Sequence, residues 1–122
     1  MTSYKELIVW QKAVDVCAET YRMTDVYPRS ELYGLTQQTR KSAVSIASNI
    51  AEGWSRRHTT EYLQFLNIAL GSAAELETQL IIGNRLSFLL KSEIENAVLK
   101  VNEIMKMLTV LQSRLRAKHS RP

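Results

Sequence analysis

One stretch decides the fold of this chain more plainly than any other, residues 94–115, which read IENAVLKVNEIMKMLTVLQSRL. Apolar residues recur here at alternating spacings of three and four, the heptad pattern of a helix that packs along a seam. The seam consists of Ile94, Ala97, Val101, Ile104, Leu108, Leu111 and Leu115. Ser92 lies just before it and has the spacing of a capping box with Glu95, so we expect a helix over about residues 92–117.

Three earlier segments also have helical periodicity, at about residues 5–23, 30–53 and 59–85. Pro28 disfavours helix at the residue before it and so separates the first two segments. Thr59 is a candidate cap for the third. Because the connections are short, we expect an all-α, up-down-up-down four-helix bundle over residues 1–117, followed by a basic tail at 118–122.

The first two helices each have a predicted core face. On the first it carries Leu7, Trp10, Val14, Cys17 and Tyr21. On the second it carries Leu32, Leu35, Ala43, Ile46 and Ile50. Beside that second face runs a stripe of small or polar residues, Gln38, Ser42, Ser45, Asn49 and Glu52. We expect Glu52 and Glu75 to accept interhelical hydrogen bonds, with Arg40 or Asn49 as donors.

The second helix is unusually poor in charge, since only Arg40 and Lys41 are charged between residues 32 and 51. The fourth helix adds apolar residues outside its seam, Val98, Leu99, Met105, Met107 and Val110. We interpret this excess as a subunit interface. The alternative is a well-buried monomeric core with scattered apolar residues on the surface.

The composition is that of an ordinary globular domain, with 122 residues, 45% hydrophobic and 23% charged. No signal peptide is visible, and no apolar run approaches the roughly 20 residues that span a bilayer. The lone Cys17 has no partner for a disulfide or a CxxC motif, and its place among apolar residues favours an inert thiol. We therefore expect a cytoplasmic protein without membrane association.

The net charge of +4 comes from the C-terminus. Four bases lie in the last nine residues, Arg114, Arg116, Lys118 and Arg121, and the other 12 bases equal the 12 acids. In the expected topology these four share one end of the bundle with Lys5, Arg56, Arg57 and His58. A basic end of this kind suits phosphate contact, so these residues are the candidate nucleic-acid site. Trp54 beside this loop either stacks on a base or caps the core.

Motifs for catalysis or for cofactors are not evident. The Glu-x-x-His pairs of di-iron bundles are missing, as are phosphate-binding glycine loops, so no metal, cofactor or catalytic residue is predicted. Arg114 and His119 do form Arg-x-x-x-x-His, the spacing found in helical-bundle ribonucleases of the HEPN class. A short basic stretch matches this spacing easily by chance, and we expect no enzyme.

The segment from Glu31 to Gly53, ELYGLTQQTRKSAVSIASNIAEG, closely resembles the signature of four-helix-bundle proteins encoded in intervening sequences of bacterial 23S rRNA genes. The resemblance continues at Leu7-x-x-Trp10-Gln11-Lys12-Ala13 and at Gly71-Ser72-x-x-Glu75-Leu76-Glu77. It implies a bacterial, ring-shaped homopentamer without established enzymatic activity, and gene location suggests association with RNA or the ribosome. It also implies interhelix or intersubunit contacts at Gln38, Arg40, Ser45, Asn49, Glu52, Gly71 and Glu75.

Two main functional hypotheses follow. The first is a non-catalytic homo-oligomer that binds structured RNA or the ribosome through its basic end. The second is a structural or protein-binding module whose polar stripe and grooves recruit another protein. The third is the ribonuclease interpretation.

Overall fold

A computed structural model describes residues 1–119, and these residues form four α-helices and two short 3₁₀ helices with no strand. In chain order the elements are η1 (Tyr4–Glu6), α1 (Ile8–Thr24), η2 (Arg29–Glu31), α2 (Leu35–Trp54), α3 (Thr59–Arg85) and α4 (Lys91–His119). The all-α prediction is confirmed. Among these helices none combines the length and apolar character needed to cross a membrane.

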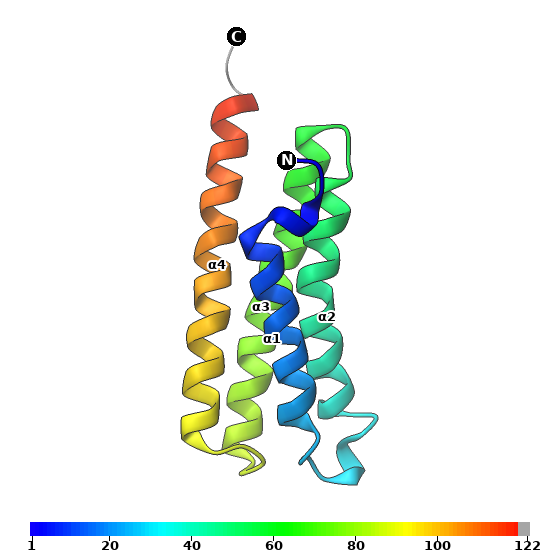
Figure 1. The fold of residues 1–122 in the computed structure, drawn as a ribbon. Helices are drawn as coiled ribbons and strands as arrows, with labels where there is room; N and C mark the ends of the chain where they lie inside the picture. Colours follow the sequence, from blue (N-terminus) through cyan, green and yellow to red (C-terminus); the bar gives the residue numbers. More distant parts are fainter. Residues whose placement is uncertain (120–122) are drawn as a thin grey trace.

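The four long helices pack side by side around one core (Figure 1). The N-terminal segment, the α2–α3 connection and the C-terminal end of α4 lie at one end of the bundle, while the other two connections lie at the opposite end. The most extensive packing is between α2 and α3, and the least extensive between neighbouring helices is between α1 and α4. Ala43, Ala69 and Ala73 are fully buried, and such small side chains let α2 and α3 approach closely.

The predicted seam of α4 is confirmed. Its central residues are buried, and the residues at its two ends pack partly against the core. Gln112 continues the buried face one turn beyond Leu108, although it is polar and only 3% exposed. Its Nε2 donates to Oδ1 of Asn67 on α3 at 2.6 Å, which satisfies the buried amide.

The predicted core face of α1 is wrong by about one position. The buried residues are Val9, Ala13, Val16, Thr20, Met23 and Thr24. Val14 and Tyr21 are exposed, whereas Leu7, Trp10 and Cys17 flank the core half-buried. The helix has two neighbouring stripes, and the one with smaller side chains faces inward. Thr20 is tolerated there because its hydroxyl donates to the Val16 carbonyl at 2.7 Å.

The start of α2 also differs from the prediction. A turn at Leu32–Gly34 separates η2 from α2, so Leu32 and the 86%-exposed Tyr33 lie outside the helix. Glu31 determines where α2 begins, because its carboxylate accepts from the Leu35 amide at 3.2 Å. The exposed Leu32 is therefore not a core residue, although Ala43, Ile46 and Ile50 are.

The predicted caps of α3 and α4 are wrong as well, although the bounds of α3 agree with the prediction. His58 occupies the cap position of α3 without a side-chain cap, and Thr59 is the first helical residue. At α4 the reciprocal bonds join Leu90 and Glu93, since the Glu93 carboxylate accepts from the Leu90 amide at 3.0 Å. The helix then continues to His119, two residues beyond the expected end.

Candidate nucleic-acid interface

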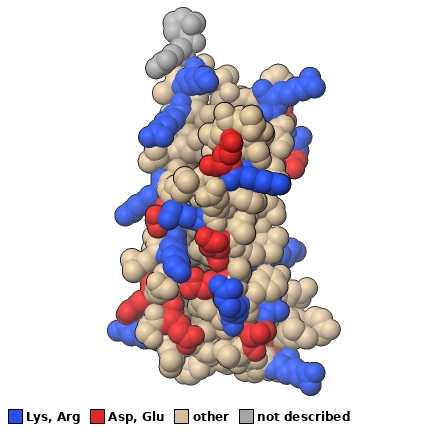
Figure 2. All heavy atoms as spheres, in the orientation of Figure 1, with Lys and Arg blue, Asp and Glu red and all other residues tan. Residues whose placement is uncertain are grey.

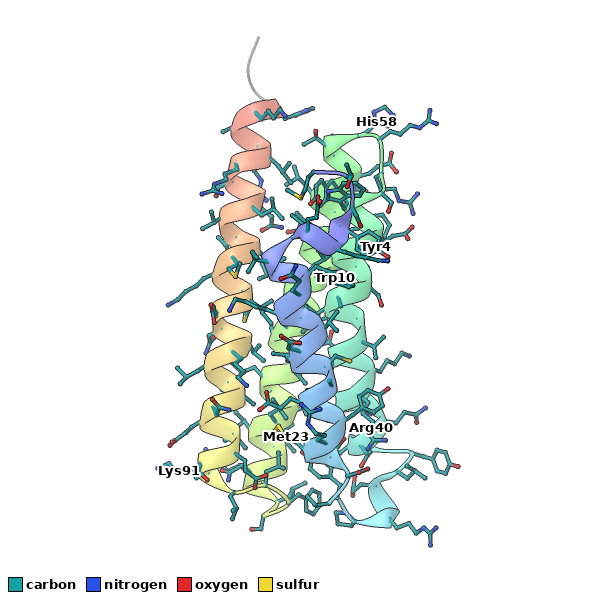
Figure 3. The ribbon with its side chains drawn as sticks, viewed as in Figure 1. Tyr4, Trp10, Met23, Arg40, His58 and Lys91 are labelled. Carbon is teal, nitrogen blue, oxygen red and sulfur yellow. The ribbon has the colours of Figure 1, made fainter. Side chains whose placement is uncertain are left out.

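One end of the bundle, the end at which α4 finishes, carries a group of basic residues that we call the basic end. Its described members are Lys5, Arg56, Arg57, His58, Arg114, Arg116 and Lys118. Arg121 lies outside the described residues. Figure 3 places His58 at this end and Lys91 at the opposite one. The loop after α2 and the last turns of α4 thus lie at one end, although about 60 residues separate them in sequence.

Arg56 has its charge offset within the chain. Its guanidinium is paired with the Glu52 carboxylate one turn earlier on α2, and lies 3.9 Å from the Glu61 carboxylate on α3. It also lies over the ring of Phe65, 4.7 Å from the centroid. These contacts make Arg56 a link between α2 and α3, and they leave little of its charge for a phosphate.

Among the basic residues available to a ligand are Arg57, Arg114 and Lys118. All three are exposed, and none has a carboxylate within 4.0 Å in the part of the chain that the structure describes. His58 and His119 are exposed beside them. Figure 2 shows Lys and Arg side chains at this end, whereas most acidic side chains on the drawn face lie towards the other end.

An aromatic cluster closes the bundle near the basic end. The ring of Tyr4 meets the edge of Trp10 at a centroid distance of 5.3 Å and that of Trp54 at 6.3 Å. Trp54 is half-buried in this cluster. Its ring contact with Tyr4 is compatible with both roles expected for it, stacking on a base and capping the core, so this choice stays a prediction.

The predicted polar stripe does not form one continuous contact. Its interhelical hydrogen bond joins Ser45 on α2 to Ser72 on α3, with 2.7 Å between the hydroxyl oxygens. Asn49 bonds within its own helix, since Nδ2 donates to the Ser45 carbonyl and hydroxyl at 2.8 and 2.9 Å. Gln38 and Glu75 are exposed. Together with Lys41, Ser42 and Gln79, these side chains line a groove of about 290 Å³ between α2 and α3.

The predicted partners of Glu52 and Arg40 are wrong. Glu52 pairs with Arg56, as described above, and no hydrogen bond joins Glu75 to Arg40 or Asn49 within the described residues. Arg40 instead bridges to α1: its Nε donates to the Thr24 hydroxyl at 2.8 Å, and its Nη2 lies 3.3 Å from the Asp25 carboxylate. Arg40 does not reach Glu75 because it lies on the side of α2 that faces α1, and not on the side that faces α3 (Figure 3).

Gly71 is exposed in the middle of α3, and a Cβ added there would meet no atom within 4 Å. Packing within the chain therefore does not require a glycine at this position. An intersubunit role for Gly71 stays a prediction of the family resemblance.

The residues of the ribonuclease motif point in different directions. Arg114 and His119 lie on the same helix five residues apart, which places them about 140° apart around its axis. Both are exposed, and no hydrogen bond joins them. Elsewhere within residues 1–119, no group of three or more His, Cys, Asp or Glu side chains is arranged to hold a metal ion. Burial raises the pKa of the Cys17 thiol, which keeps it protonated and unreactive.

One feature was missed by sequence reasoning, an apolar groove of about 490 Å³ between the start of α1 and the second half of α4. Leu7, Ile8, Met107, Val110 and Leu111 are among its lining residues. The signal that pointed to it was the surplus of apolar residues outside the α4 seam. Of that surplus, Met105 and Met107 pack partly against the core, whereas Leu99 and Val110 are 70% and 47% exposed.

The geometry described above is that of a four-helix bundle without an evident catalytic centre in its described part. The chain belongs to the family of 23S rRNA-intervening sequence proteins, whose model matches residues 5–110. A similar solved structure is a protein of unknown function from the S23 ribosomal protein family of Bacteroides thetaiotaomicron. It shares 25% sequence identity and has a TM-score of 0.78, and the match covers 86% of this chain and 98% of that one. No curated protein matches the chain.

Proposed function

We propose that this protein is a non-enzymatic, cytoplasmic, up-down-up-down helical bundle that forms a homo-oligomer and binds structured RNA through its basic end. The observation that carries the proposal is the convergence of Arg57, Arg114 and Lys118, which are exposed and have no acidic partner in the described region. Phosphates that bind such cations release counterions, which supplies affinity independently of base sequence.

The family supplies the choice of RNA as the ligand. The family's name refers to 23S rRNA intervening sequences, and we extend this to RNA or the ribosome as the partner of this chain. The resemblance also implies a ring of five copies. In such a ring the basic ends would form an annulus, which would multiply the phosphate contacts that one copy makes.

The test is RNA binding as a function of salt. A fluorescently labelled RNA stem-loop is titrated with protein between about 50 and 200 mM salt, a range over which several phosphate contacts weaken binding by orders of magnitude. The variant Arg57→Ala/Lys118→Ala should bind more weakly, and the slope of log K against log salt should flatten by about 0.9 for each duplex phosphate that it no longer neutralises. Arg56→Ala should have a smaller effect than Arg57→Ala, because Glu52 and Glu61 already offset its charge.

The matched control is Arg29→Ala/Lys91→Ala, which removes the same charge at the opposite end. It should leave affinity and slope unchanged. An equal reduction in the control, or no affinity of the native protein at about 100 mM salt, would overturn the basic-end mechanism.

A second candidate function is protein binding at the groove between α2 and α3. This candidate is supported by Gln79, whose side-chain oxygen is buried without a hydrogen-bond partner in the described region beside that groove. If docking turns the Gln79 side chain towards the groove, a donor of the bound protein satisfies this oxygen. Gln79→Leu should then weaken capture of that partner while leaving the RNA titration unchanged.

A further inference from the structure

The solvent-facing side of α4 carries an ordered pattern of charge. Six exposed residues form what we call the α4 stripe: Glu95, Leu99, Glu103, Lys106, Val110 and Arg114. Their spacings of three and four place them within about 100° of the helix circumference, opposite the buried seam. The first half of the stripe is acidic, the second half is basic, and each half contains one exposed apolar residue.

This order is self-complementary when two copies of α4 lie antiparallel. Consider a two-fold axis that passes midway between Glu103 and Lys106. Glu103 of one copy then lies opposite Lys106 of the other copy, and Lys106 lies opposite Glu103. The same axis places Leu99 against the partner's Val110, and Glu95 against the partner's Arg114. Each pairing occurs twice, so every charge in the stripe meets an opposite charge. A parallel alignment would instead set like charges together.

We propose that the α4 stripe is an isologous interface through which two copies of this chain pair antiparallel. Charge complementarity favours a second copy over an unrelated partner. In a single antiparallel alignment, the acidic half of each stripe faces the basic half of the other. The Glu103–Lys106 pairs lie at the centre of the contact, an apolar pair of Leu99 and Val110 lies on each side of them, and the Glu95–Arg114 pairs lie at its two ends.

The apolar groove beside the stripe supports the same register. It lies between the start of α1 and the second half of α4, where Val110 forms part of its wall together with Ile8 and Met107. Antiparallel pairing brings the partner's Leu99 to Val110 and hence to the mouth of this groove. A leucine that is 70% exposed in one chain thereby gains an apolar pocket in the other.

The ion pairs within one chain do not prevent this exchange. Lys106 and Arg114 have no carboxylate within 4.0 Å in the described region. Glu103 contacts Lys12 at 3.0 Å and Glu95 approaches Lys91 at 4.0 Å, but these pairs are substantially exposed and contribute little. Glu103 can therefore reorient towards the partner's Lys106 at small cost.

This pairing goes beyond the proposed function and does not depend on RNA binding. An isologous contact joins copies in twos, whereas a ring closes through a different, heterologous contact. Arg114 belongs to both the stripe and the basic end, so the experiment uses Glu103 and Lys106, which lie outside the basic end.

The first experiment is charge reversal, measured by sedimentation over a dilution series at low salt. Lys106→Glu and Glu103→Lys should each weaken pairing at least about tenfold, because each sets like charges against one another at two symmetric places. The double variant Glu103→Lys/Lys106→Glu restores opposite charges and should return to within about threefold of the native protein. Lys41→Glu, an exposed reversal on α2, is the charge-matched control and should have no effect.

The second experiment fixes the register with a disulfide, in a Cys17→Ala background. Leu99→Cys/Val110→Cys should form a covalent dimer on oxidation. Either single cysteine should not, since 11 residues span about 16 Å along a helix and a disulfide joins Cα atoms about 6 Å apart. Three results would overturn the proposal: a monomeric native protein at about 100 µM, double and single reversals that behave alike, or single cysteines that cross-link as well as the pair.

Discussion

Substitution by alanine should change the stability of the fold in opposite directions at two glycines of α3, Gly71 and Gly83. Gly71 is exposed, and an added Cβ would meet nothing within 4 Å. Gly83 is buried, and an added Cβ would lie 2.2 Å from the Tyr27 hydroxyl oxygen and 3.1 Å from its ring carbon Cζ. Both lie within the helix, so the difference in response isolates packing from helix propensity.

At Gly71 the substitution changes stability through helix propensity alone. Alanine is favoured over glycine inside a helix by about 1 kcal/mol, so Gly71→Ala should stabilise the protein by about that amount. For a chain of this size the melting temperature should rise by about 4 °C.

At Gly83 the gain in helix propensity is smaller than the cost of forcing a methyl group against Tyr27. The Tyr27 ring is held against Phe88 at a centroid distance of 5.1 Å, which limits how far it can retreat. Forcing an extra methyl group into a packed core costs about 1–3 kcal/mol, and this contact is close enough to reach the upper part of that range. After the gain of about 1 kcal/mol in propensity, Gly83→Ala should destabilise by about 1–2 kcal/mol.

The assay is urea unfolding followed by circular dichroism, together with light scattering to check that the assembly is unchanged. A third variant tests the cause. In a Tyr27→Phe background the hydroxyl is removed, so the cost of Gly83→Ala should fall although the contact with Cζ remains. Equal stabilisation by both alanines would refute the packing argument. A fall in both stability and mass in Gly71→Ala would instead support the intersubunit role that the family resemblance implies.

Two further predictions follow from single side chains. Burial, and secondarily Glu93, raises the pKa of Tyr27 from 10.0 to about 12, so its neutral phenol stabilises the fold fully below pH 10 and loses this effect as the pH rises towards 12. Melting temperatures recorded from about pH 8 to 11 should therefore fall less steeply in Tyr27→Phe than in the native protein. Arg40→Lys should cost about 1 kcal/mol in urea unfolding, because an ammonium cannot contact Thr24 and Asp25 and also lie over Tyr21; an unchanged midpoint would show that the bridge contributes nothing.

The sequence alone was sufficient to predict those features of the structure that depend on local residue spacing. The heptad spacing in α4 predicted its buried face, because the period of a helix fixes which residues share a side. The same reasoning predicted α3 to its observed bounds and the class of fold as all-α. The signature in the second helix was also enough to indicate the family to which the chain belongs.

The tertiary structure was needed where two local patterns compete. In α1 two neighbouring stripes are apolar enough to be buried, and the one with Ala13 and Thr20 faces the core. The loop cations looked equivalent in sequence. Arg56 pairs locally with Glu52, and α3 adds Glu61 and the Phe65 ring to its surroundings, whereas Arg57 beside it has no carboxylate within 4.0 Å in the described region. Periodicity assigns a residue to a side of its helix, but the partner that it finds there comes from a distant part of the chain, and only the packing of the helices brings the two together.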